Sequence, residues 1–104
     1  MSYMELSRTR PVAAAWENLT DAQNEKQTTA IYEVIGRNGG DVKVVTFSPS
    51  HNALTSVIEY PDQISAMTTV AEILALGTLE YVEIEPLWDV VEFTGLVRSA
   101  AAKK

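Results

Sequence analysis

The order in which helical and extended patterns alternate constrains the fold of this chain more than any single motif. Two stretches carry apolar residues at the spacing of one helix face, and glycine closes each of them, first at Asn38-Gly39-Gly40 and then at Gly77. Asp62 fits the N-cap of the second helix. The apolar positions are Val12, Ala15, Trp16, Leu19, Ala30, Ile31, Val34 and Ile35 in the first stretch, and Ile64, Met67, Val70, Ala71 and Leu74 in the second.

Four segments have the character of strands. Residues 2–9 alternate weakly, and residues 41–48, 53–60 and 78–87 are rich in β-branched and aromatic side chains. Residues 49–52 predict a turn that joins the middle two strands into a hairpin. Residues 89–98 fit either a short strand or a helix, and residues 99–104 are expected to form a flexible tail.

Two interpretations of the region before the first glycine pair remain open. Thr20-Asp21-Ala22-Gln23 fits a capping box, in which the threonine and glutamine side chains satisfy free backbone amides. Either a helix begins near Pro11 and breaks near Thr20, or residues 12–19 are the first strand and the helix begins at Asp21. Three consecutive alanines are poor strand formers, which favours the first interpretation.

The resulting order, β-α-β-β-α-β, predicts a single α+β domain over residues 1–104 with a ferredoxin-like antiparallel sheet and both helices on one face. Strict alternation places Val42 and Val44 on one face and Val45 and Phe47 on the other. The third and fourth strands also show apolar groups on both faces. Because a monomer would leave one of these faces in water, we expect a homodimer or a higher homo-oligomer.

Composition excludes several kinds of site and partner. The chain has no cysteine and one histidine, so thiolate and multi-histidine metal sites are excluded within a chain, and no cofactor is expected. A net charge of −6 argues against nucleic acid and anionic membranes as partners. No apolar run approaches the roughly 20 residues of a membrane helix. The opening MSYMELSRTR lacks the apolar stretch of a signal peptide, which predicts a cytoplasmic location.

Three short motifs resemble the GYD-domain family of small α+β proteins. They are NGGDVK at residues 38–43, VIEYPD at residues 57–62 and ALGTL at residues 75–79. The resemblance implies the dimeric α+β barrel fold. The Gly-x-Tyr-Asp signature of the family falls on Ser50, His51, Asn52 and Ala53, so its tyrosine and aspartate are absent here.

Two classes of function fit these observations. The first is a module that binds a small hydrophobic ligand or serves assembly or regulation. The second, which the related dimeric barrels also include, is a cofactor-independent enzyme of the monooxygenase or isomerase type acting on a small organic molecule. For such an enzyme the candidate catalytic residues are His51, Asn52 and Glu59, because they offer an imidazole, an amide and a carboxylate near one strand.

Three aromatic residues are candidates for ligand binding. Trp16, Tyr81 and Trp88 combine a large apolar surface with a polar group, although core or interface packing is the more common role of such residues. Weaker hypotheses are an anion clamp at Arg8 and Arg10 and a cation site at the carboxylates of residues 83 and 85. An exposed strand edge explains the two carboxylates more simply, and the two arginines are more simply ordinary surface charges in an acidic chain.

Overall fold

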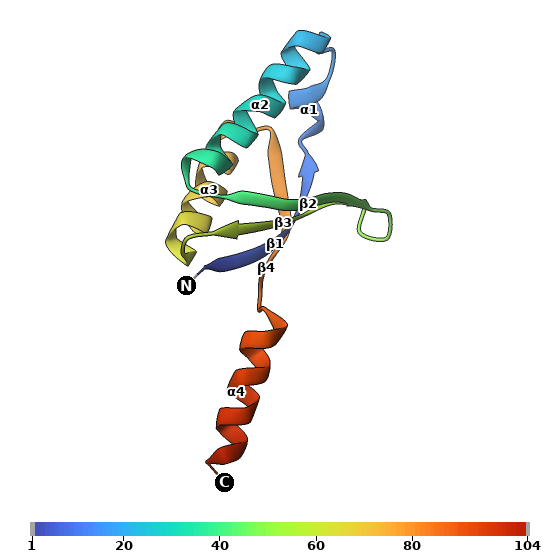
Figure 1. Ribbon diagram of the computed structural model, residues 1–104. Helices are drawn as coiled ribbons and strands as arrows, with labels where there is room; N and C mark the ends of the chain where they lie inside the picture. The colour runs from blue at the N-terminus through green and yellow to red at the C-terminus, as the bar shows by residue number, and fades with distance from the viewer. Residues whose placement is uncertain (1, 104) are drawn as a thin grey trace.

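The computed structural model describes residues 2–103 and confirms the ferredoxin-like α+β architecture (Figure 1). Its antiparallel sheet has the strand order β2-β3-β1-β4, so β1 and β3 are central and β2 and β4 form the edges. The bounds of the strands are Tyr3–Pro11 for β1, Asp41–Ser48 for β2, Ala53–Tyr60 for β3 and Leu79–Leu87 for β4. Pro86 lies within edge strand β4, where the missing amide donor costs least.

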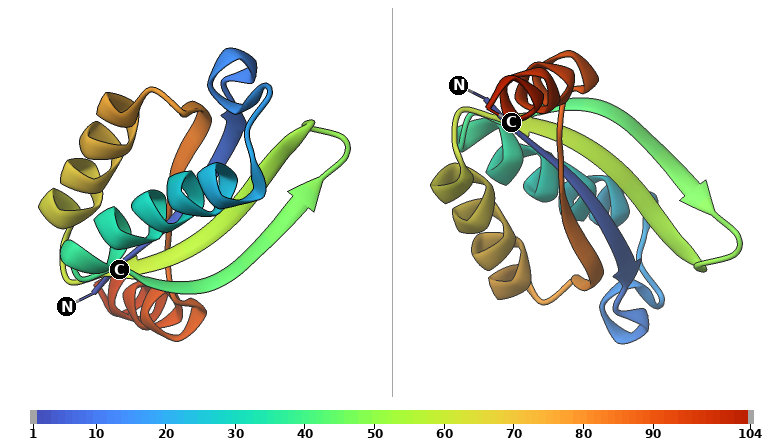
Figure 2. Two further views of the ribbon diagram at one scale, coloured as in Figure 1. Left: turned by 90° about the horizontal axis from the view of Figure 1, so that it is seen from above. Right: turned by 90° about the horizontal axis from the view of Figure 1, so that it is seen from below.

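Two long helices, α2 (Asp21–Arg37) and α3 (Gln63–Leu76), lie on one face of the sheet, as Figure 2 shows. Asp62 accepts a hydrogen bond from the Ser65 amide and so begins α3, while Gly77, at φ 73°, ends it. The two helices are joined by Glu72, which pairs with Arg37 and accepts a hydrogen bond of 2.9 Å from the side-chain amide of Asn38.

The N-terminal region follows the favoured interpretation in having helix before Thr20. Only Ala13–Trp16 are helical there, however, Pro11 ends β1, and the long helix begins at Asp21 as in the other interpretation. A short helix, α1 (Ala13–Trp16), follows β1 and the chain breaks before α2. At that break Thr20 and Gln23 form the predicted capping box, with bonds of 2.8 and 3.2 Å. The alternative of a first strand at residues 12–19 is therefore wrong.

Residues beyond β4 form a helix, which settles the choice left open by the sequence. α4 (Val90–Ala102) begins at Asp89, whose carboxylate accepts hydrogen bonds from the amides of Val91 and Glu92. The expectation of a flexible tail from residue 99 requires correction, because Ser99 to Ala102 continue this helix; Lys104 lies outside the described residues. No helix within residues 2–103 has the length and apolar character needed to cross a bilayer.

The core lies between the sheet and the two long helices. Its centre combines residues from α2, β3, α3 and β4, namely Val34, Ile35, Ile58, Tyr60, Ala66, Ile73 and Leu79.

The apolar residues of β1 suggest that Met4 and Leu6 face the core, but the structure shows the opposite arrangement. Glu5, Ser7 and Thr9 are buried on the helix-bearing face, whereas Met4 and Leu6 lie on the open face. The central strand therefore places one carboxyl and two hydroxyl groups beneath the helices.

A β-bulge near Lys43 corrects the expected alternation of β2. The register pairs Val42 with Ile58 and Val44 with Val57, so one residue of β2 has no partner between them. Val45 and Phe47 consequently lie on the same face as Val42, which is the helix-bearing face.

The same correction applies to β4. A second register shift places Tyr81 and Ile84 together on the helix-bearing face, opposite Thr9 and Ser7 of β1. Strict alternation along the sequence would place these two side chains on opposite faces, so the register shift corrects it. The open face is instead mixed, with apolar and charged side chains interspersed; it includes Met4, Leu6, Arg8, Val44, Thr55, Val57, Glu59, Glu83 and Glu85.

Candidate functional site

A cavity of about 280 Å³ lies between α2 and the helix-bearing face of the sheet. It forms because α2 packs along α3 and leaves space above β2 and β3. The hairpin of β2 and β3 extends past α2, as Figure 2 shows, and the pocket residues Tyr32, Val45 and Leu54 are exposed there, so the cavity opens on that side. We call this cavity the α2 pocket.

Apolar and aromatic side chains make up most of the wall of the α2 pocket. Thr9, Thr28 and Ser56 supply three aliphatic hydroxyl groups and Tyr32 a phenol, and no charged side chain among residues 2–103 lines the pocket. An apolar cavity with a few hydroxyl groups is typical of a site for a small neutral molecule, which these groups orient. The apolar and aromatic members of the wall are Pro11, Trp16, Ile31, Tyr32, Ile35, Val42, Val45, Leu54, Ile58 and Leu79.

Trp16 is the predicted ligand-binding residue that the structure places in this pocket. Its indole Nε1 donates a hydrogen bond of 2.7 Å to the carbonyl oxygen of Thr78, just before β4. Gln27 of α2 donates to the carbonyl oxygen of Ala15, which ties α1 to α2. These two bonds fix the indole ring at the wall of the pocket.

The other two aromatic candidates lie elsewhere. Tyr81 packs against the core, and burial raises the pKa of its hydroxyl above the ordinary value. Trp88 is exposed where β4 ends, beside a separate surface hollow that Glu59 also lines. The three aromatic residues therefore do not converge on one site.

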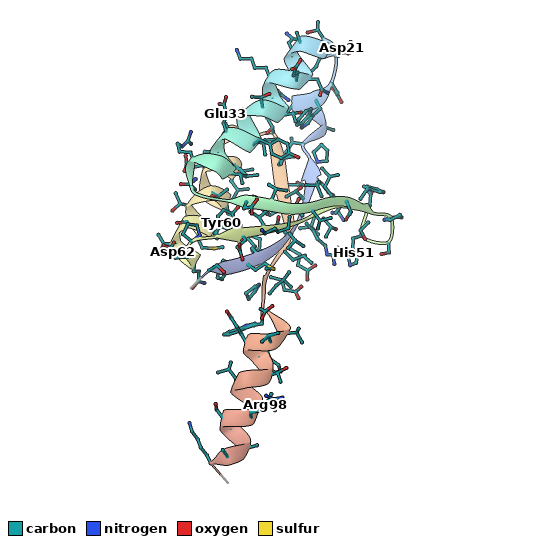
Figure 3. The ribbon with its side chains drawn as sticks, in the orientation of Figure 1. Asp21, Glu33, His51, Tyr60, Asp62 and Arg98 are labelled. Carbon is teal, nitrogen blue, oxygen red and sulfur yellow. The ribbon has the colours of Figure 1, made fainter. Side chains whose placement is uncertain are left out.

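His51 and Asn52 lie in the turn between β2 and β3, at the tip of the hairpin (Figure 3). The Nδ1 atom of His51 is 2.9 Å from the Ser48 hydroxyl oxygen. Arg10 donates to the carbonyl oxygens of both turn residues, at 2.7 and 2.9 Å, and so holds the turn against β1. Asn52 has a φ of 47°, which an asparagine tolerates in a tight turn.

Glu59 lies on the open face near the other end of β3. Its carboxylate accepts a hydrogen bond of 3.1 Å from the hydroxyl of Ser2 and is 3.8 Å from the Lys43 ammonium. Seven steps of extended chain separate it from Asn52, a span of about 23 Å. The structure does not bring His51 and Glu59 together.

The charged residues of β1 and β4 bind one another. Arg8 donates to Glu83 at 2.8 Å and to the Thr55 hydroxyl at 2.7 Å, while Arg10 holds the hairpin turn. Both guanidinium groups are thus occupied by protein acceptors. Within residues 2–103 no group of three or more histidine, cysteine or acidic side chains is placed to hold a metal ion.

Glu5 is the titratable residue that the sequence interpretation missed. Its side chain is 1% exposed, and its Oε2 atom has no hydrogen-bond partner among the residues that the structure describes. Burial raises the pKa of this carboxyl to about 7 and that of nearby Tyr60 to about 12. The period-two spacing of Tyr3 and Glu5 was the available signal, since it places both residues on one face of β1.

Comparison with known proteins supports the fold. No family model matches the chain, and no curated protein matches it. Among solved structures, a mutant chlorite dismutase from Candidatus Nitrospira defluvii superposes on it with a TM-score of 0.62 at 11% identity, over 82% of this chain and 38% of that one. The chain thus spans little more than a third of that protein. At this identity the likeness shows a shared ferredoxin-like α+β fold and nothing about activity.

Proposed function

We propose that this protein binds a small, neutral, mainly apolar molecule in the α2 pocket. The observation that carries the proposal is the combination of mainly apolar walls and a few hydroxyl groups around one cavity of about 280 Å³. A charged ligand is disfavoured there, because no side chain of opposite charge compensates the loss of its hydration. A planar molecule with one or two oxygen atoms fits best, since it can stack on Trp16 and bond a hydroxyl group.

The proposal includes self-association of the chain. Many large apolar side chains are exposed on a single copy, among them Val45, Phe47, Phe93 and Leu96. Contiguous apolar patches beyond a few hundred Å² are uncommon on monomers. A homodimer covers such surfaces without requiring another protein.

Binding can be tested with N-phenyl-1-naphthylamine, a neutral aromatic probe. Trp88→Phe leaves Trp16 as the single tryptophan, and Trp16→Phe leaves Trp88 as the single tryptophan. We expect the probe to change the emission of Trp16 in the first variant and to leave that of Trp88 unchanged in the second. A response of Trp88 alone would place the probe at the other end of the sheet and contradict the proposal.

Filling the cavity with a larger side chain gives a second test, for which a neighbouring residue of α2 supplies the matched control. Thr28 lines the α2 pocket, whereas its neighbour Thr29 is exposed on α2 outside that pocket. Thr28→Trp should weaken probe binding at least about tenfold, because the indole occupies space that the probe needs. Thr29→Trp adds the same side chain to the same helix and should leave the affinity unchanged. Equal affinities in both variants would overturn the assignment of the pocket.

A second candidate function rests on Glu5. A buried carboxyl whose pKa is near neutrality can accept or donate a proton at physiological pH. It lies opposite Ile58, which lines the α2 pocket, so the carboxyl is next to a residue of the pocket wall. A cofactor-independent enzyme would be supported if Glu5→Gln abolished turnover of a bound compound without weakening its binding. Unchanged turnover would remove Glu5 from that mechanism.

A further inference from the structure

Helix α4 extends away from the rest of the chain. Figure 1 shows it leaving the end of β4 and pointing away from the sheet and from both long helices. None of its residues is buried, and the radius of gyration of 16.5 Å exceeds the roughly 13 Å expected for a compact domain of this length. One face of the helix is nonetheless apolar, being formed by Val90, Phe93, Leu96, Val97, Ala100 and Ala101.

A second unpartnered apolar surface lies at the open side of the α2 pocket. Tyr32 of α2, Val45 and Phe47 of β2 and Leu54 of β3 are all exposed there, and Phe47 is 57% exposed. We call these four residues the groove rim. The register of the hairpin places its three strand residues on the face that carries α2.

The α4 helix of the same chain cannot cover this rim. It begins after Leu87, which pairs with Met4 at the end of the sheet remote from the hairpin turn. It also leaves from edge strand β4, whereas the rim lies on the opposite edge of the sheet. The two residues that connect β4 to α4 span at most about 7 Å, and α3 already covers β4 on the helix-bearing face.

We propose that α4 lies across the groove rim of a second copy of this chain, in a reciprocal exchange about a two-fold axis. In this arrangement each α4 buries its apolar face against the partner and covers the open side of the partner's α2 pocket. The inference rests on the proposed self-association and is independent of whether a small molecule occupies the pocket.

The area buried by this exchange is sufficient for a dimer. A helix of 13 residues is about 20 Å long and 10 Å wide, so half of its surface laid on a groove buries about 300 Å² on each side. Two reciprocal contacts then bury about 1,200 Å², which reaches the lower limit for stable protein interfaces.

Charge also favours the exchange. Residues 89–104 contain three basic and two acidic side chains and carry a net charge of +1, whereas the rest of the chain carries −7. Figure 3 shows two of the groups concerned, Glu33 on the outer side of α2 and Arg98 on α4. The C-terminal segment, whose positive charge comes from Arg98, Lys103 and Lys104, is therefore attracted to the acidic body of the partner, while two bodies alone repel.

The open face of the sheet fits α4 less well. Arg8 and Glu83 form an ion pair near its centre, and Glu59 and Lys43 add further charge. Covering these groups with an apolar helix would remove their hydration without supplying new partners. Covering the groove rim removes no charged group from water, because its exposed side chains are apolar and aromatic.

The absence of cysteine from the chain permits a direct test by disulfide cross-linking. A full-length chain carrying Phe93→Cys in α4 is mixed with one carrying Val45→Cys in the rim and is mildly oxidised. We expect a mixed disulfide between the two chains. Two control pairs should give no mixed disulfide. The first combines Val91→Cys, which lies outside the apolar face of α4, with Val45→Cys. The second combines Phe93→Cys with Thr46→Cys, which lies on the other face of β2.

The outcomes separate this inference from the proposed self-association. A dimeric mass with links only between two Phe93→Cys chains would show that α4 pairs with itself, which overturns the exchange but retains the dimer. Equal linking in the control pairs overturns the exchange as well. A mass of 11.4 kDa for the unmodified chain at high concentration overturns both proposals.

Charge substitution gives a second measurement that does not need a cross-link. Phe93→Glu combined with Val97→Glu should raise the dissociation constant of the dimer at least about 100-fold, because the carboxylates would be buried without partners. The fold of each chain should persist, since both residues are exposed within one chain. Val91→Glu is the matched control and should leave the dissociation constant unchanged. A dimer that tolerates the double substitution contradicts the exchange.

Discussion

Glu5 and Ile58 lie directly opposite each other across the pairing of β1 and β3, with both side chains on the helix-bearing face. Ile58 forms part of the wall of the α2 pocket, and Glu5 is buried beside it. The fold thus places a proton-binding group next to a residue that lines the α2 pocket. The same pairing gives the carboxyl few polar neighbours, which makes its ionisation energetically unfavourable.

The ionisation of Glu5 predicts how stability depends on pH. Its pKa of about 7 in the folded chain exceeds the ordinary value of 4.5, so between these pH values the folded chain holds a proton that the unfolded chain has lost. This contribution to stability is fully present below about pH 4.5 and is lost as the pH rises toward 7. The loss amounts to about 3 kcal/mol in the free energy of unfolding.

Glu5→Gln should remove that dependence, because the amide resembles the protonated carboxyl and does not ionise. We expect the variant to match the unmodified chain at pH 4.5 and to be more stable at pH 7.5, as measured by urea unfolding. Both proteins are compared at each pH, because Asp62 and Glu72 have lowered pKa values and lose their stabilising effect as the pH falls. A stability difference that is the same at both pH values would contradict the account of Glu5.

The sequence was sufficient to predict the elements of the fold, because local signals mark where they begin and end. The capping box at Thr20, the N-cap at Asp62 and the glycine at residue 77 all lie where the structure has helix ends. Such signals act over a few residues and need no tertiary information. The weak pattern of residues 89–98 was ambiguous because α4 makes no packed contact that would impose a clear periodicity within one chain.

Faces and sites were harder to predict, since they depend on pairing between distant strands. A bulge near Lys43 shifts every later side chain of β2 to the other face, and nothing in the strand composition indicates it. The wall of the α2 pocket is formed by residues that are far apart in the chain. The sequence indicates Trp16 as a candidate because it is a large aromatic residue, but no local pattern marks Thr9 or Ser56 as pocket residues. Glu5 was passed over because Met4 and Leu6 suggested the opposite burial.

The capping box predicts a local contribution to stability. Thr20→Ala removes the hydroxyl that accepts a hydrogen bond from the Gln23 amide at the start of α2. We expect it to lower the free energy of unfolding by about 1 kcal/mol, as measured by urea denaturation. Thr29→Ala, within the same helix and exposed, should have a much smaller effect or a slightly stabilising one. Equal losses from both substitutions would show that the cap contributes nothing specific.

Two glycines near the end of α2 should respond in opposite ways to substitution by alanine. A Cβ atom at Gly40 would lie 2.9 Å from the carbonyl oxygen of Ile35 and 2.9 Å from the Tyr60 ring, so Gly40→Ala should cost about 1–3 kcal/mol. Gly36 is within the helix and has open space around it, so Gly36→Ala should stabilise the chain by about 0.5–1 kcal/mol. Thermal unfolding of the two variants under one buffer condition measures both changes. A stabilised Gly40→Ala variant would contradict the close packing there.

The position of the binding site predicts which polar residues do not matter for it. His51 and Glu59 lie outside the α2 pocket, near the two ends of β3, and neither lines its wall. His51→Ala and Glu59→Gln should therefore leave the affinity for N-phenyl-1-naphthylamine unchanged. Ile31→Asn, which places an amide in the wall of the pocket, should weaken it about tenfold or more, because the apolar probe cannot satisfy the buried amide. Circular dichroism confirms that each variant is folded before its affinity is compared by fluorescence titration. Weakened binding in His51→Ala alone would move the site to the hairpin turn.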